Sequence, residues 1–130
     1  MIPDIDFFGS EANFHHLGLV VKSITDVVAD AQIITDPVQR VRLSFVKLNG
    51  VCIELLEPTG PDSPVFQSLQ KKIKLVHICY SVPDITKAIA DAEPHGCVCI
   101  ARPVMAVAFN SQIAWLYHRD YGLIELLETA

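Results

Sequence analysis

The apolar and polar positions of this chain form the same pattern twice. In each copy a short apolar run of strand length, 16–21 or 77–82, precedes apolar residues spaced three and four apart, which is the spacing of one helical face. Ser23 and Asp84 stand just before these stretches and are typical N-cap residues. The two helical faces consist of Ile24, Val27, Val28 and Ala31, and of Ile85, Ala88, Ile89 and Ala92. The pattern therefore predicts a strand followed by an amphipathic helix in each half.

Further strands are predicted behind each helix. In the first half, residues 41–48 and 51–57 are strand-like runs separated by Asn49 and Gly50, a pair that favours a two-residue hairpin. In the second half, 97–100 is one strand, and 112–117 and 123–128 flank a turn over 118–122. Each half is therefore predicted to be a βαβββ module, and the fold class is α+β.

The two modules also repeat individual residues. The segment His16–Ala31 recurs as His77–Ala92 with seven identical positions, and Ile53–Glu57 recurs letter for letter as Ile124–Glu128. Two matches in the same order indicate a duplicated unit.

The domain organisation follows from this repeat. We expect an N-terminal arm over 1–13 and a single domain over 14–130. That domain is expected to contain module one (14–58), a turn-rich linker with a short helix (59–74) and module two (75–130). Because a module of about 60 residues buries its own sheet poorly, the two modules are expected to share one core.

The repeat places four polar residues at equivalent positions. Side chains alternate across a strand, so His16 faces away from Leu17 and Leu19, and Glu54 faces away from Ile53 and Leu55. Duplication supplies His77 and Glu125 at the matching places, so that two histidines and two glutamates can meet at one centre. Such a set can bind a divalent metal, Zn, Ni, Co, Mn or Fe, which the ligand types do not distinguish. The alternative is that the histidines are hydrogen-bonded core residues and the glutamates are edge-strand charges.

Composition and charge exclude other classes of protein. A chain of 130 residues that is 51% apolar can fold without a metal or disulfides, so a metal would serve chemistry. A net charge of −5 with scattered Lys and Arg argues against nucleic acid as a partner. An acidic N-terminus and the lack of a long apolar run argue against a membrane partner and predict a soluble, cytoplasmic protein. The four cysteines lie in apolar runs and are expected to be buried free thiols.

These features resemble the vicinal oxygen chelate superfamily, which includes glyoxalase I, methylmalonyl-CoA epimerase, extradiol dioxygenases and antibiotic resistance proteins. The resemblance covers about 15–128 and implies paired βαβββ modules that form a cup-shaped, partly open barrel-like sheet around a metal. The family's ligand positions match His16, Glu54, His77 and Glu125. Within the family, the stretch 53–64 and the segment 75–78 look most like methylmalonyl-CoA epimerase.

The resemblance implies a metal-dependent lyase or isomerase of the glyoxalase I or epimerase type, which stabilises an enolate-like intermediate of a small oxo- or acyl-substrate. The candidate catalytic bases are Glu125 and Glu54. Asp36 is the candidate for a second acid or base, although beside Pro37 it is also typical of a turn. Module one is about ten residues shorter than in epimerases, which predicts a trimmed helix and second strand and puts a CoA thioester substrate in doubt.

Two other functions stay open: a non-catalytic small-molecule binder and an Fe(II) ring-cleaving dioxygenase. The exposed outer edges of the sheets favour a homodimer. His15 is expected to face away from His16 and to be structural, and His118 and Arg119 are expected to be solvated turn residues. Phe45 either lines the cup or belongs to the core.

Overall fold

The structure is a computed structural model, and it describes residues 1–129. The chain divides into two compact units. One unit is His16–His77, and the other joins Met1–His15 to the chain from Ile78 onward. Because the two boundaries lie inside the first strand of each module, each unit holds one module of the predicted repeat.

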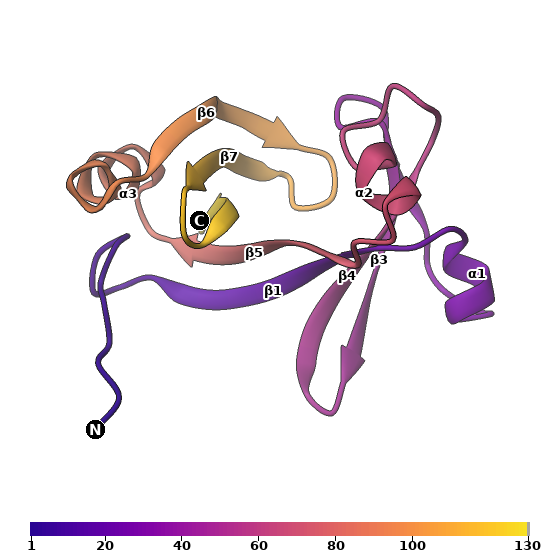
Figure 1. The fold of residues 1–130 in the computed structure, drawn as a ribbon, viewed down its shortest axis with the longest axis horizontal. Coiled ribbons are helices and arrows are strands. Elements are labelled where there is room, and N and C mark those ends of the chain that lie inside the picture. Colours follow the sequence, from indigo (N-terminus) through magenta and orange to yellow (C-terminus); the bar gives the residue numbers. More distant parts are fainter. Residues whose placement is uncertain (130) are drawn as a thin grey trace. The chain divides into compact units, whose positions relative to one another are not determined.

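The unit His16–His77 carries the first module and the linker (Figure 1). Its elements are β1 (Asn13–Val20), α1 (Ile24–Val27), β2 (Ile34–Asp36), β3 (Val41–Leu48), β4 (Val51–Pro58) and α2 (Phe66–Gln70). The strand order is β2-β3-β4-β1, with β1 parallel to β4 and the other pairs antiparallel. The module is therefore βαβββ, and the predicted short linker helix is present as α2.

The hairpin β3–β4 turns where the sequence predicts it. Asn49 and Gly50 both have positive φ, 48° and 86°, which a two-residue turn of this hand requires. The hairpin pairs Phe45 with Glu54 and Lys47 with Cys52, so these four residues lie on one face of the sheet. The opposite face packs under α1, where Ile24, Ile53 and Leu55 form the buried core.

The second unit carries the second module and the N-terminal arm. Its elements are β5 (Leu75–Val82), α3 (Ile85–Ala92), the 3₁₀ helix η1 (Glu93–His95), β6 (Val98–Ala106), β7 (Ser111–His118) and β8 (Gly122–Glu128). The strand order is β5-β8-β7-β6, with β5 parallel to β8. This is the strand and helix order of module one again, as the repeat predicts.

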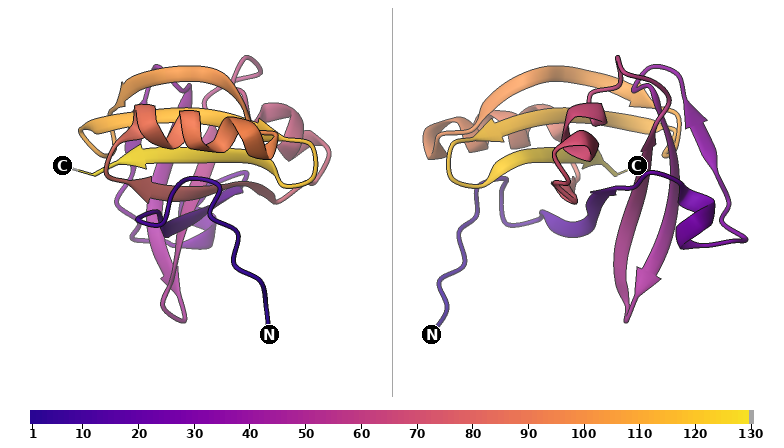
Figure 2. Two further views of the ribbon diagram at one scale, coloured as in Figure 1. Left: turned by 90° about the vertical axis from the view of Figure 1, so that its left-hand side faces the viewer. Right: turned by 45° about the vertical axis from the view of Figure 1, so that its right-hand side comes forward.

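Helix α3 lies over one face of the strands of its own module and runs alongside them (Figure 2). All four residues of its predicted apolar face are buried, and they pack on Ala114, Leu116, Ile124 and Leu126. The Asp84 side chain accepts a hydrogen bond from the Lys87 backbone N–H at 3.1 Å, which confirms the predicted N-cap. Phe7, Phe8 and Ala12 of the N-terminal arm pack against the same cluster.

Three predictions about the elements were wrong. Helix α1 ends at Val27, and Val28 is already extended, so the helical face predicted to run to Ala31 is not formed. The predicted Ser23 cap is also missing, because its side chain makes no capping hydrogen bond. Strand β6 is longer than predicted, since it runs on to Ala106 through two register shifts. The trimmed helix and the three-residue strand β2 agree with the short first module.

The cysteines are free thiols, as predicted. Cys79 and Cys97 are buried, whereas Cys52 and Cys99 are half-buried. In the part of the chain that the structure describes, no helix is long and apolar enough to cross a membrane.

Candidate metal centre

Three predicted ligands meet inside the unit His16–His77. His16 lies on β1, His77 on β5 and Glu54 on β4. The two Nε2 atoms are 3.2 Å apart, and each is 3.3 Å from Oε1 of Glu54. All three residues are buried, with 0%, 5% and 5% of their surface exposed. Two imidazoles and one carboxylate therefore converge on one point that water hardly reaches.

Strand alternation turns these side chains to the same face. Leu17, Leu19 and Val21 pack with Ile53 and Leu55 in the core under α1, as the pattern predicts. His16 and Glu54 alternate with these residues along their strands, so their side chains project from the opposite face of the sheet. The parallel register places Gly18 beside Glu54, which aligns the two strands for the contact.

Gly18 makes room for the His77 ring. A Cβ atom built on Gly18 would lie 2.2 Å from Cε1 and 2.4 Å from Nδ1 of His77, distances at which something must shift. Its φ is not in the left-handed region, so the requirement is for space and not for backbone conformation. The prediction from sequence missed this residue, although a glycine on the ligand face, two positions after His16, was a signal for it.

An aromatic wall stands beside His16. The ring of Phe45 contacts the His16 ring edge to face, with 5.4 Å between centroids and 78° between planes. Because Phe45 pairs with Glu54 across the hairpin, it lies next to both groups. Of its two predicted roles, core residue or lining residue, the structure supports lining this site.

Cys52 is the half-buried neighbour of this cluster on β4. Burial raises the pKa of its thiol above the usual value, nearby Lys47 lowers it, and Glu54 raises it. The pKa of this thiol is therefore influenced by the charges of Lys47 and Glu54, which lie on the same face of the sheet.

Glu125, the fourth predicted ligand, belongs to the other unit. It lies on β8, where it pairs with Cys79 of β5 and Trp115 of β7, and 3% of its surface is exposed. Ile124 and Leu126 on either side of it pack under α3, so Glu125 leaves the face of its sheet opposite to the helix. In each module the predicted ligand glutamate, Glu54 or Glu125, thus projects from the sheet face that is not covered by the helix.

The second glutamate of each repeat has a role that the prediction missed. Oε1 of Glu57 accepts the backbone N–H of Ile24 at 2.9 Å, and Oε2 of Glu128 accepts that of Ile85 at the same distance. These N–H groups begin α1 and α3, so each carboxylate caps the helix of its own module. Arg42 holds Glu57 in place through Nη2, 2.6 Å from Oε2. The letter-for-letter repeat of Ile53–Glu57 was the signal for a shared role.

Asp36 has a turn role. It is buried, and its Oδ1 accepts the backbone N–H groups of Val38 and Gln39, both at 3.0 Å. These bonds shape the turn between β2 and β3. They confirm the turn role that is typical of an aspartate beside Pro37.

The expected exposure of His118 was wrong, whereas Arg119 is exposed as predicted. Only 7% of the His118 surface is exposed. Its Nδ1 accepts hydrogen bonds from the backbone N–H groups of Asp120 and Tyr121, at 3.0 and 3.3 Å. The ring proton is therefore on Nε2, which donates a hydrogen bond to the His95 carbonyl oxygen at 3.0 Å. Phe7 stacks on the His95 ring, with 4.7 Å between centroids, and also contacts the His118 ring at 5.4 Å. His118 therefore joins η1 to the β7–β8 turn.

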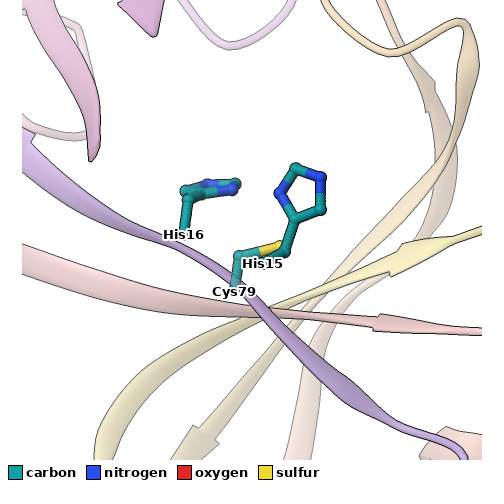
Figure 3. A group of neighbouring side chains, drawn as sticks. All are labelled: His15, His16 and Cys79. Atoms are coloured by element: carbon teal, nitrogen blue, oxygen red, sulfur yellow. The ribbon is translucent and has the colours of Figure 1, made fainter. Parts of the chain in front are cut away.

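His15 and Cys79 form a second group of possible ligands (Figure 3). A ring nitrogen of His15 and the sulfur of Cys79 lie within 4.8 Å of one another. His15 is half-buried and contacts the Phe109 ring edge to face at 5.6 Å. The predicted structural role of His15 is consistent with this packing. The prediction that His15 faces away from His16 is wrong, because ligand nitrogens of these two neighbouring residues lie within 4.8 Å of one another.

Known proteins are similar to this chain in sequence. The chain matches the Glyoxalase/Bleomycin resistance protein/Dioxygenase superfamily over residues 15–115. It is 33% identical over 94 residues to the mitochondrial methylmalonyl-CoA epimerase of Homo sapiens, an alignment that covers 69% of this chain and 53% of the relative. The Mus musculus enzyme is 29% identical over 100 residues, which cover 74% of this chain and 56% of the relative. The chain thus spans about half the length of these curated relatives.

Solved structures share the fold. A hypothetical protein from Bacillus halodurans C-125 superposes with a TM-score of 0.74 and 28% identity, over 93% of this chain and 96% of the other. Methylmalonyl-CoA epimerase from Mycobacterium tuberculosis superposes with a TM-score of 0.73 and 19% identity, over 90% and 87%. These superpositions confirm the predicted glyoxalase-like fold. Because the family match extends from the first strand of one module into β7 of the other, the chain belongs to the glyoxalase/bleomycin resistance protein/dioxygenase superfamily.

Proposed function

We propose that this protein is a metal-dependent epimerase or isomerase of a small acyl substrate. Its metal is held by His16, Glu54 and His77, with Glu125 as the fourth ligand. The observation that carries the proposal is the mutual spacing of 3.2–3.3 Å between two imidazole nitrogens and one carboxylate oxygen in a buried place. Glu125 is included because it occupies in module two the position that Glu54 occupies in module one.

The spacing fits a bound cation. Neighbouring ligand atoms that surround one ion at about 2.0–2.1 Å are about 2.8–3.0 Å apart in octahedral geometry and about 3.3–3.4 Å apart in tetrahedral geometry. The spacings of 3.2–3.3 Å in this cluster lie close to the tetrahedral value. Zn, Ni, Co, Mn and Fe all accept imidazole and carboxylate ligands, so the ligand set leaves the metal open.

The chemistry divides between the metal and the carboxylates. A divalent cation held by His16, Glu54 and His77 would supply a Lewis acid for a carbonyl or carboxylate oxygen of the substrate. A carboxylate base removes the proton on the neighbouring carbon, and a proton returned to the opposite side inverts that carbon. Glu54 is close to both histidines, so we assign the base to Glu125, which would act after its displacement from the metal by substrate, with Glu54 as the alternative.

The substrate proposal comes from the relatives. Two curated relatives are named methylmalonyl-CoA epimerase, and one solved neighbour is described in complex with methylmalonyl-CoA. An acyl thioester with a second carboxylate is therefore the first substrate to test. Module one has only a four-residue helix and a three-residue second strand, so the surroundings of the thioester are expected to differ from those in the relatives.

One observation favours a second candidate function. Two histidines and one carboxylate are the ligand set of non-haem Fe(II) oxygenases, which leave the other coordination positions open for substrate and oxygen. His16, His77 and Glu54 form such a set inside one unit. Oxygen uptake by the Fe(II)-loaded protein with catechol, and none without it, would support a ring-cleaving dioxygenase.

The proposal is tested by metal analysis followed by proton exchange. Purified protein is incubated with each of the five metals and desalted, and its metal content is measured by mass spectrometry. The loaded protein is then mixed with methylmalonyl-CoA in heavy water, and deuterium at the carbon between the two carbonyl groups is followed by NMR. We expect about one metal per chain and catalysed exchange.

The matched variants are His77→Ala and Glu128→Gln. His77→Ala removes one of three convergent ligands, so it is expected to lose tight metal binding and exchange while the protein stays folded. Glu128 lies on the helix face of its sheet, so Glu128→Gln is expected to keep both metal binding and proton exchange. A wild-type protein that stays metal-free with all five metals would contradict the proposal and favour a non-catalytic binder. Metal that stays stoichiometric in His77→Ala would contradict the ligand assignment.

A further inference from the structure

The sheet face that carries the candidate metal ligands also carries a positively charged side chain, Lys47. The hairpin register pairs Lys47 of β3 with Cys52 of β4, and it pairs Phe45 with Glu54. Residues directly opposite each other in a sheet share a face, so Lys47 leaves the sheet on the side of Glu54. Val46, which lies between Phe45 and Lys47 in the sequence, packs in the core on the other face of the sheet.

Lys47 is in line with His16 across three strands. The parallel register sets Leu17 beside Ile53 and Gly18 beside Glu54. Continued by one residue, this register would set His16 beside Cys52. Cys52 in turn pairs with Lys47. Two strand spacings separate the Cα atoms of His16 and Lys47, which is about 10 Å. The half-buried Cys52 between them is small, so a molecule held at the ligand cluster can extend toward Lys47.

The ammonium group of Lys47 is available to a ligand. Within the described residues Lys47 forms no ion pair, whereas Arg42 binds Glu57 and Lys87 binds Asp91. Its side chain is exposed and lies on a long flexible stem, while the ligand cluster beside it is buried. A positive charge at the edge of a buried site favours anionic ligands.

We infer that Lys47 is a specificity-determining residue, which selects substrates with a second anionic group, a carboxylate or a phosphate, beside the atoms that the metal holds. The inference rests on the proposed function, because it requires a ligand at His16, Glu54 and His77. Phe45 contacts His16 on the same face and supplies an apolar wall between the two polar ends of this site.

The test measures ligand preference on the full chain loaded with Co²⁺, whose visible absorption reports binding at the metal. Three hydroxamate probes are titrated: acetohydroxamate, succinic acid monohydroxamate and phosphonoacetohydroxamate. The last two add a carboxylate or a phosphonate to the same metal-binding group. We expect wild-type protein to bind at least one of these two about fivefold more tightly than acetohydroxamate, the value of one partly exposed ion pair. The probe that gains affinity identifies the anion.

The matched variants are Lys47→Met and Lys71→Met, which both remove an exposed lysine of the same unit. Lys47→Met is expected to bind the three probes equally, with acetohydroxamate affinity unchanged. Lys71→Met is expected to keep the wild-type preference. Added salt should weaken the preference in wild-type protein, because it screens an exposed charge.

The outcomes separate this inference from the proposed function. A preference that persists in Lys47→Met, or no preference in wild-type protein, overturns the role of Lys47 and leaves the metal site standing. A protein that gives no Co²⁺ spectrum overturns the metal site and the role of Lys47 together.

Discussion

At the scale of single residues, the candidate site depends on a position that carries no side chain. Gly18 lies against the His77 ring, and any Cβ there would overlap it. His77 is also fixed by its contacts with His16 and Glu54, so its ring has little freedom to move away. The orientation of a ligand is therefore determined by the size of its neighbour.

We expect Gly18→Ala to weaken metal binding by about tenfold or more, as displacement of a supporting contact does in other metal sites. The charge and the ligands are unchanged, so the loss would come from the moved His77 ring. Isothermal titration with Zn²⁺ measures the affinity. Gly60→Ala is the control, because Gly60 also lacks a positive φ and its Cβ would meet only the exposed end of Asp62, at 3.3 Å. Equal affinity in both variants would contradict the steric role of Gly18.

At the scale of elements, each module joins its last strand to its helix through one carboxylate. Glu57 and Glu128 stand three residues after Glu54 and Glu125. An odd separation in a strand turns two side chains to opposite faces. One glutamate of each pair therefore faces the helix, and the other faces away from it.

We expect Glu128→Ala to lower the free energy of unfolding by about 1 kcal/mol, the usual cost of a lost helix cap. Metal affinity should not change, since Glu128 lies on the helix face. Urea denaturation followed by circular dichroism measures the first effect, and a metal titration measures the second. Glu128→Gln keeps an oxygen acceptor and is expected to lose less stability. A large drop in metal affinity with Glu128→Ala would show that the two faces are not independent.

The same elements show what the sequence could predict. The prediction of helix α3, with its cap and its buried face, is confirmed. Here the apolar spacing agrees with local preference, because alanines at 88, 90 and 92 favour a helix and Asp84 caps its start. The predicted α1 failed beyond Val27, since Ile24, Thr25, Val27 and Val28 are β-branched and favour extended backbone. Periodicity describes which face is apolar, and it does not weigh these preferences.

The predictions about the site divide in the same way. His16, Glu54 and His77 were predicted from the repeat and lie together. Gly18, Glu57, Glu128 and the burial of His118 depend on contacts between residues far apart in sequence, which a pattern along the chain does not contain.

At the scale of the whole molecule, the fold is held by apolar cores and not by the candidate metal. Each unit has its own buried cluster under its helix, and the ligand cluster is separate from both. The protein is therefore expected to fold without metal, and bound metal is expected to add stability through binding alone.

Metal at about one hundred times its dissociation constant should add about 2.7 kcal/mol of stability. For a chain of this size that corresponds to a rise in Tm on the order of 10 °C. Calorimetry of wild-type protein with and without Zn²⁺ measures it, and His77→Ala should show no comparable rise. The rise should shrink as pH falls, because protons compete with the metal for the imidazoles. An equal rise in His77→Ala would place the stabilising ion elsewhere.

The space at Gly18 also means that the two halves are no longer interchangeable. In the alignment of the repeats, the counterpart of Gly18 is Cys79, which has a side chain. A symmetrised protein built from two copies of the second half would set a thiol where the His77 ring now lies. A symmetric design should therefore start from the first half, whose glycine leaves room in both places.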